Sequence, residues 1–185
     1  MPRGILDVGA NQGITSVYFR LCFPQAEIVA VEPDPATFPI LEENAKRIGR
    51  CATHRLALLD RNGTASFKSS QISVVSTLYD LPYSQIQNDI VSVQLRHAGD
   101  FADEAVSSIG MPGFDMLKID TEGAEVPIMR ALGHRLAGIK TIFLEFHSLE
   151  DRRIIEAMLA PSHDLRRERL DAPERGSLTF LRRVV

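Results

Sequence analysis

Four side chains that can move protons or bind cations follow two predicted strands of this sequence. Asp120 and Glu122 come directly after the apolar run Met116–Ile119, and Glu145 and His147 end the next apolar run. Residues two apart face the same way on an extended chain, so Glu145 and His147 share one side. If both strands flank one ligand, the four groups meet at one rim. The pattern predicts acid–base chemistry, with Asp120 or His147 as the base and Glu122 and Glu145 as orienting groups.

Two other interpretations of these residues stay open. A divalent cation could be held by Asp120, Glu145 and His147, and such oxygen and imidazole ligands suit manganese or zinc better than calcium. Glu122 and Glu125 could instead stabilise the start of the helix that follows, where negative charge is favourable. We assign no metal ligand from the sequence.

A glycine-rich turn carries the strongest signal in the chain, between a predicted strand and a predicted helix: Leu6-Asp7-Val8-Gly9-Ala10-Asn11-Gln12-Gly13. In doubly wound sheets a nucleotide-like ligand lies across the carboxyl end of the first strand. Glycine allows a close approach there, because it has no Cβ, and it permits unusual backbone angles. A dinucleotide site needs three glycines, and only Gly9 matches, since Asn11 and Ile14 occupy the other two positions.

A carboxylate, Glu32, ends the second predicted strand. It lies about 20 residues after the turn, the spacing expected of an acid that binds a ribose. One carboxylate can accept hydrogen bonds from both ribose hydroxyls. The turn and the acid together, in this order, favour a cofactor site over a purely structural turn.

Short apolar runs alternate with helical patterns, which is typical of βαβ units around a parallel sheet. Apolar residues at 14, 17, 18 and 21 predict one face of a helix after the glycine-rich turn. Residues 103–109 predict a short helix, and 69–88 a loop. The tail predicts an antiparallel pair at one edge of the sheet. The predicted strands lie near 5–8, 28–31, 54–59, 116–119, 141–146, 165–170 and 178–184.

The composition excludes several classes of protein. The 185 residues fit a single domain over 1–185. The formal net charge is −3 and acids are interspersed among the arginine pairs of the tail, so no nucleic-acid partner is expected. No apolar run reaches the roughly 20 residues that span a membrane. The N-terminus lacks the apolar run of a signal peptide, and Cys22 and Cys51 are expected to be reduced, which predicts a cytoplasmic protein.

The chain resembles the FkbM family of S-adenosylmethionine-dependent methyltransferases over most of its length. The resemblance is carried by the turn described above, Val31-Glu32-Pro33, Leu41 with Asn44, Leu117-Lys118-Ile119-Asp120-Thr121-Glu122-Gly123-Ala124-Glu125 and Leu144-Glu145-Phe146-His147. It implies an α/β fold, a doubly wound, Rossmann-like seven-strand methyltransferase sheet whose last strand is antiparallel. It also implies S-adenosylmethionine as the cofactor.

The resemblance further implies which residues contact this cofactor. Asp7, Gly9 and Gly13 would line its methionine side, Glu32 would bind its ribose, and Ala57 and Leu58 would flank its adenine. Asn11 and Pro33 are predicted as further contacts of the cofactor. The chain departs from the family in two places. It begins almost at the first strand, so a cap that the family often carries before that strand is expected to be absent. Residues 97–100 also read His-Ala-Gly-Asp where a Leu-Asp-Asp-like turn is usual.

The function expected from this resemblance is O-methylation of a hydroxyl on a small molecule, such as a sugar or a secondary metabolite. Nothing in the residues selects the acceptor. A binding domain without catalysis and a nucleotide-dependent oxidoreductase are the alternatives. A homodimer, in which a neighbouring copy replaces the cap, also stays open.

Overall fold

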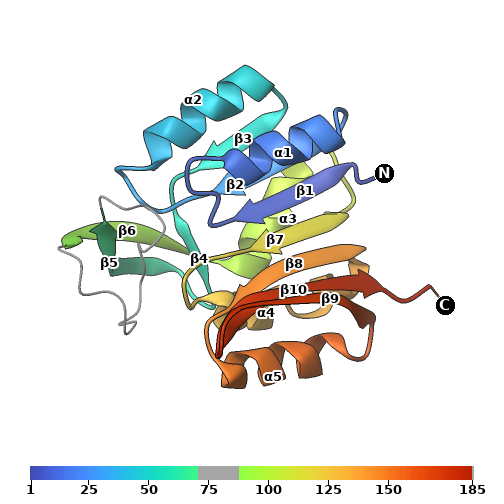
Figure 1. Cartoon of the computed structure of the whole chain (residues 1–185). Coiled ribbons are helices and arrows are strands. Elements are labelled where there is room, and N and C mark those ends of the chain that lie inside the picture. Colours follow the sequence, from blue (N-terminus) through green and yellow to red (C-terminus); the bar gives the residue numbers. More distant parts are fainter. Residues whose placement is uncertain (71–87, 185) are drawn as a thin grey trace.

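A mostly parallel sheet organises the chain in the computed structural model, which describes residues 1–70 and 88–184. Seven strands of this described part form the sheet, and β10 runs antiparallel to both of its neighbours (Figure 1). The predicted fold class is therefore confirmed. In sheet order the strands are β3 (Cys51–His54), β2 (Glu27–Val31), β1 (Gly4–Val8), β7 (Met116–Ile119), β8 (Thr141–Phe146), β10 (Arg175–Arg182) and β9 (His163–Ala172).

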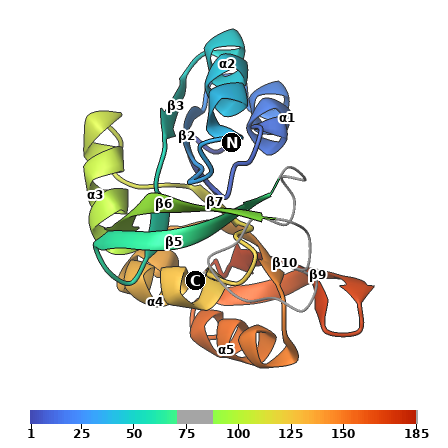
Figure 2. The same cartoon turned by 90° about the vertical axis from the view of Figure 1, so that its left-hand side faces the viewer.

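Helices cover both faces of this sheet, as a doubly wound fold requires. Figures 1 and 2 show α1 (Ile14–Cys22) and α2 (Phe38–Ile48) together on one face. The opposite face carries α3 (Ala98–Ser108), α4 (Glu125–Leu132) and α5 (Leu149–Leu159), and a short 3₁₀ helix, η2 (Gly133–Gly138), follows α4. No helix in the described part of the chain is long and apolar enough to cross a membrane.

A second, smaller sheet was only partly predicted. The strand expected at 54–59 divides between β3 of the main sheet and β4 (Ala57–Leu59) of the small one. There β4 pairs with β6 (Asn88–His97), which pairs in turn with β5 (Gly63–Ser70). The loop expected at 69–88 falls mostly outside the described residues. The helix expected at 103–109 begins earlier, at Ala98, because the His97 ring accepts a hydrogen bond from the Asp100 amide and caps it.

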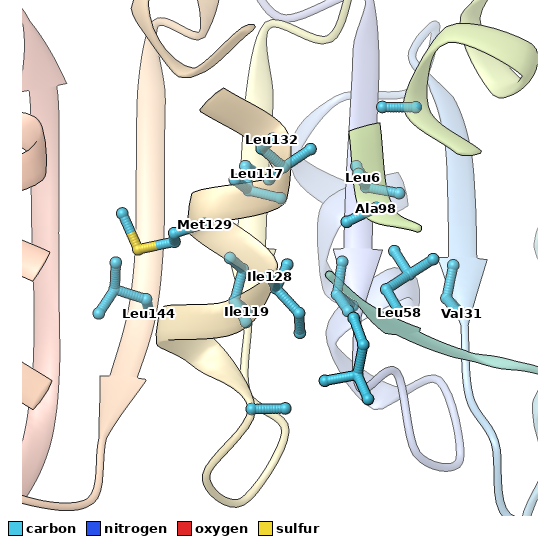
Figure 3. Packing of buried hydrophobic residues seen from close by; sticks show 14 of the residues in the cluster. Leu6, Val31, Leu58, Ala98, Leu117, Ile119, Ile128, Met129, Leu132 and Leu144 are labelled. Carbon is cyan, nitrogen blue, oxygen red and sulfur yellow. The ribbon is translucent and has the colours of Figure 1, made fainter. Parts of the chain in front are cut away.

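The main core lies between the sheet and α4. Figure 3 shows Leu117 and Ile119 of β7 and Leu144 of β8 facing Ile128 and Met129 of α4. These side chains are almost completely buried. The strands β1 and β7 are buried along their whole length, as expected of central parallel strands that helices cover. The carboxyl ends of both strands are thus held in a rigid frame.

The apolar stripe predicted on α1 is real, but it does not enter the core. Ile14, Tyr18 and Leu21 are exposed, whereas Ser16 and Phe19 are the buried residues of this helix. On the buried face of α1, Phe19 packs with Ile5 and Ile28 of the sheet, and the Ser16 hydroxyl donates a hydrogen bond to the Asp7 carboxylate. Periodicity located the helix correctly and did not identify which face is buried.

Candidate functional site

The turn after β1 is shaped by the end of β7, which passes directly behind it. Gly9 has φ 71°, and a Cβ at this position would lie 1.8 Å from the Asp120 carbonyl oxygen. The amides of Gly9 and Ala10 both donate to the Val31 carbonyl at 3.0 Å, which ties the turn to the end of β2. Only glycine fits between these two contacts. The turn, β2 and β7 therefore meet at one point.

Glu32 lies at this meeting point and is almost completely buried. Its carboxylate accepts hydrogen bonds from the backbone amides of Asn11 (2.8 Å) and Asp34 (2.9 Å). Burial raises the Glu32 pKa to about 7, although these two amides oppose the shift. Each oxygen keeps a second lone pair, so the group can still accept bonds from two further donors.

One cavity joins this corner to three carboxylates at the ends of β7 and β8, Asp120, Glu122 and Glu145, which we call the acidic rim. Most of the residues predicted to contact a cofactor line it, and so do two of the three predicted catalytic residues. The lining residues are Val8, Gly9, Asn11, Val31, Glu32, Pro33, Leu56, Ala57, Leu58, Phe67, Asp120, Thr121, Glu122, Ala124, Glu145 and Arg175.

Three predicted site residues do not line this cavity. Asp7 is fully buried beneath the turn, where it accepts the Ser16 hydroxyl at 2.7 Å. Gly13 packs against Leu41 of α2, whose Cδ1 would lie 2.8 Å from an added Cβ. His147 is packed among the acids of the rim. Asp7 and Gly13 therefore shape the turn from behind it.

The acidic rim is built from β7, β8 and β10. Asp120 follows β7, and burial raises its pKa. Glu122 follows in a left-handed conformation with φ 53°, which is unusual for a residue other than glycine and is often found at functional sites. Arg175, at the start of β10, places one guanidinium nitrogen 3.4 Å from a carboxylate oxygen of Glu122 and 3.4 Å from one of Glu145.

His147 lies within this group of carboxylates, with only 3% of its side chain exposed. Its Nε2 is 3.1 Å from Glu122, and its Nδ1 is 3.5 Å from Glu125. Burial alone would lower the His147 pKa, but these two carboxylates outweigh it and raise the pKa to about 10. An imidazole with this pKa keeps its proton at neutral pH, so His147 is a cation here and a poor proton acceptor.

The sequence left open a metal site that includes Asp120, and the structure groups the candidate ligands differently. Glu122, Glu145 and His147 offer ligand atoms within 4.8 Å of one another. The Arg175 guanidinium already lies against both of these carboxylates. A histidine must also lose its proton before it binds a metal, which the raised pKa of His147 disfavours. We assign no metal to this cluster.

Sequence reasoning missed Arg175, Leu56 and Phe67 as cavity residues. Arg175 reaches the rim because β10 of the β9–β10 hairpin returns antiparallel beside β8. The residues next to Arg175 in the sequence form no recognisable motif. Phe67 belongs to the small sheet, whose pairing spans distant parts of the chain. Leu56 directly precedes the predicted Ala57, and this proximity was the one signal that could have included it.

Comparison with known proteins agrees with this geometry. The family model described as "Methyltransferase FkbM domain" matches residues 7–171, which is most of the chain. The chain belongs to the FkbM methyltransferase family. The family implies S-adenosylmethionine as the methyl donor, and the matched range includes Gly9, Glu32 and the carboxylates of the acidic rim.

Two curated relatives of this FkbM domain are the 2-O-methyltransferase NoeI of Sinorhizobium fredii and the hexuronic acid methyltransferase AglP of Haloferax volcanii. Each is 27% identical to the chain, over 84% of it for NoeI and 83% for AglP. The alignments cover 66% of NoeI and 60% of AglP, so the chain spans about two thirds or less of the length of these relatives.

Solved structures share the fold of this FkbM domain at low sequence identity. A precorrin-6y C5,15-methyltransferase from Geobacter metallireducens aligns with a TM-score of 0.53 at 12% identity, over 97% of this chain and 80% of that one. TrmK of M. capricolum, solved with S-adenosylhomocysteine, aligns with a TM-score of 0.54 at 12% identity, over 97% of this chain and 62% of that one. These likenesses concern the fold alone.

Proposed function

We propose that this domain transfers a methyl group from S-adenosylmethionine to a hydroxyl of a small molecule, such as a sugar or a secondary metabolite. The observation that carries the proposal is the single cavity that connects the Gly9 turn and Glu32 with Asp120. The names of two relatives, the 2-O-methyltransferase NoeI and the hexuronic acid methyltransferase AglP, favour a hydroxylated acceptor.

The residues of the cavity fit an adenosyl group. Glu32 has unused lone pairs that can accept hydrogen bonds from both ribose hydroxyls. These hydroxyls would replace the water molecules that the carboxylate loses on burial. Ala57 and Leu58 present apolar surface for a base. The missing Cβ of Gly9 leaves the backbone open to close approach. When bound, the cofactor supplies a methyl group on a positively charged sulfur.

The rim residues would then handle the acceptor. Methyl transfer requires in-line alignment, so the protein must mainly hold the acceptor oxygen in place. We assign Asp120 as the base that accepts the hydroxyl proton, because it lines the cavity beside Gly9. Glu122 and Glu145 would accept hydrogen bonds from the acceptor. His147, protonated among the acids, would hold Glu122 in position rather than act as the base.

Calorimetry and a turnover assay test this proposal. We expect binding of S-adenosylhomocysteine without binding of NAD, and methyl transfer to at least one member of a panel of hydroxylated acceptors. The Asp120→Asn variant should bind S-adenosylhomocysteine normally and lose about 10²- to 10⁴-fold in kcat, the usual contribution of a general base. Binding of the product without turnover on any acceptor would favour a binding domain instead. Near-normal kcat in Asp120→Asn would refute the base assignment.

A further inference from the structure

Lys118 is a buried cation at the centre of the sheet that the proposed mechanism does not yet use. Its side chain leaves β7 beneath the glycine-rich turn, with only 11% of it exposed. The ammonium donates hydrogen bonds to the carbonyl of Gly9 at 2.6 Å and to that of Val8 at 3.3 Å. It also lies 3.4 Å from the Asp7 carboxylate and 3.6 Å from that of Asp120.

These contacts keep Lys118 charged in spite of its burial. Burial favours the neutral amine, but Asp7 and Asp120 outweigh that effect and raise the Lys118 pKa. The two carboxylates have different roles in the fold. Asp7 is fully buried in β1 and lies behind the turn, whereas Asp120 lines the cavity. The Lys118 ammonium thus connects the backbone of the glycine-rich turn with Asp120, the proposed base.

The backbone alone does not orient the Asp120 side chain. The β1–β7 ladder and the hydrogen bond from the Asp120 amide to the Val8 carbonyl fix its main chain. The negative charges of Glu122, Glu125 and Glu145 act on the same carboxylate and favour a rotation away from them, and the His147 cation offsets this only in part. Within the described residues, Lys118 is the one cation within 4.0 Å of the Asp120 carboxylate.

We propose that Lys118 is a positioning residue for methyl transfer, which holds the Asp120 carboxylate at a fixed place relative to the turn that receives the cofactor. This inference rests on the proposed function. Alignment between groups on different strands is what an in-line displacement needs, and a misplacement of about 1 Å can cost about 10²-fold in rate. Lys118 does not itself line the cavity, but it contacts three residues that do, Val8, Gly9 and Asp120, and of these only Asp120 is proposed to take part in the chemistry.

The test must separate this role from simple neutralisation of Asp7. Lys118→Met leaves the Asp7 carboxylate buried without its counter-ion, which destabilises the fold whatever Lys118 does for catalysis. The double variant Lys118→Met/Asp7→Asn removes both charges of the pair. Asp7→Asn alone is the reference for this double variant. Lys46→Met, a change at an exposed lysine of α2, is the control expected to resemble the wild type.

Three quantities are measured for each variant: the melting temperature, the Kd for S-adenosylhomocysteine, and kcat with the acceptor found in the panel. We expect Lys118→Met to melt at a lower temperature and the double variant to recover most of the loss. The Kd of the double variant should stay within about threefold of that of Asp7→Asn, because Gly9 and Ala10 are still tied to Val31. Its kcat should be about 10- to 100-fold below that of Asp7→Asn.

Equal kcat in the double variant and in Asp7→Asn would overturn the positioning role, since Lys118 would then matter only as the counter-ion of Asp7. A loss of S-adenosylhomocysteine binding equal to the loss of kcat would overturn it too, because Lys118 would then support only the turn. Failure of the wild type to bind S-adenosylhomocysteine is a different result. It would reject the proposed function itself, and the role of Lys118 with it.

Discussion

At the scale of single residues, burial and neighbouring charges together set the charge of the groups in and beside the cavity. Burial removes water from the Glu32 carboxylate and outweighs the two backbone amides that donate to it, so its pKa rises to about 7. Glu125 is equally buried, but the His147 cation beside it lowers its pKa. Strongly shifted groups of this kind gather at functional sites, because catalysis and binding need charges that water would otherwise screen.

The raised pKa of Glu32 predicts pH-dependent cofactor binding. Ribose hydroxyls donate to the ionised carboxylate and therefore lower its pKa in the complex. Affinity should rise as the pH passes upward through 7, because the free protein then no longer has to release a proton. Between pH 6 and pH 8 we expect the Kd for S-adenosylhomocysteine to fall by up to about tenfold in calorimetry.

The matched control for this prediction is Glu32→Gln, which has nearly the same shape and no titrating group. It should bind more weakly than the wild type at pH 8. The roughly tenfold change of Kd between pH 6 and pH 8 that we expect for the wild type should be absent in Glu32→Gln. If the two proteins showed parallel pH profiles, another group would be responsible for the dependence.

At the scale of elements, the site depends on how closely the turn after β1 approaches the end of β7. Gly9 and Gly110 both have positive φ, 71° and 66°, but a Cβ at Gly110 would have no atom within 4 Å. An alanine at either position suffers the same backbone strain, and only an alanine at position 9 adds a steric clash. Alanine at either position costs about 1–2 kcal/mol for the left-handed conformation.

Gly9→Ala should therefore be much worse than Gly110→Ala. The new Cβ would overlap the Asp120 carbonyl, so β7 and the turn must separate. We expect about 1–3 kcal/mol of destabilisation beyond that of Gly110→Ala in urea unfolding, together with loss of S-adenosylhomocysteine binding. Equal stability of the two variants would show that the turn can move without cost.

At the scale of the whole molecule, apolar side chains divide into those that hold the layers together and those that do not. Leu117 is fully buried between the sheet and α4, whereas Leu21 is 75% exposed on α1. Leu117→Ala should cost about 2–5 kcal/mol in urea unfolding, because it leaves a cavity in a packed core. Leu21→Gln should change stability by less than about 0.5 kcal/mol. A large loss for Leu21→Gln would mean that another surface covers this face of α1.

The sequence by itself determined the parts of this protein that depend on local order along the chain. The turn at Gly9, the acid at Glu32 and the carboxylates at Asp120 and Glu122 each follow a buried strand, and strands of a parallel sheet end at the same edge. Local apolar patterns therefore indicated both the doubly wound sheet and the edge at which the candidate site lies.

Only the tertiary structure decided which charges meet. The β9–β10 hairpin brings Arg175 to Glu122 and Glu145, and packing places His147 among acids that keep it protonated. Lys118 reads as one polar residue in an apolar run, and its contact with Asp7, which lies far away in the chain, exists only in the folded protein. Side-chain charge depends on burial and on neighbours from distant segments, and neither is encoded in local spacing.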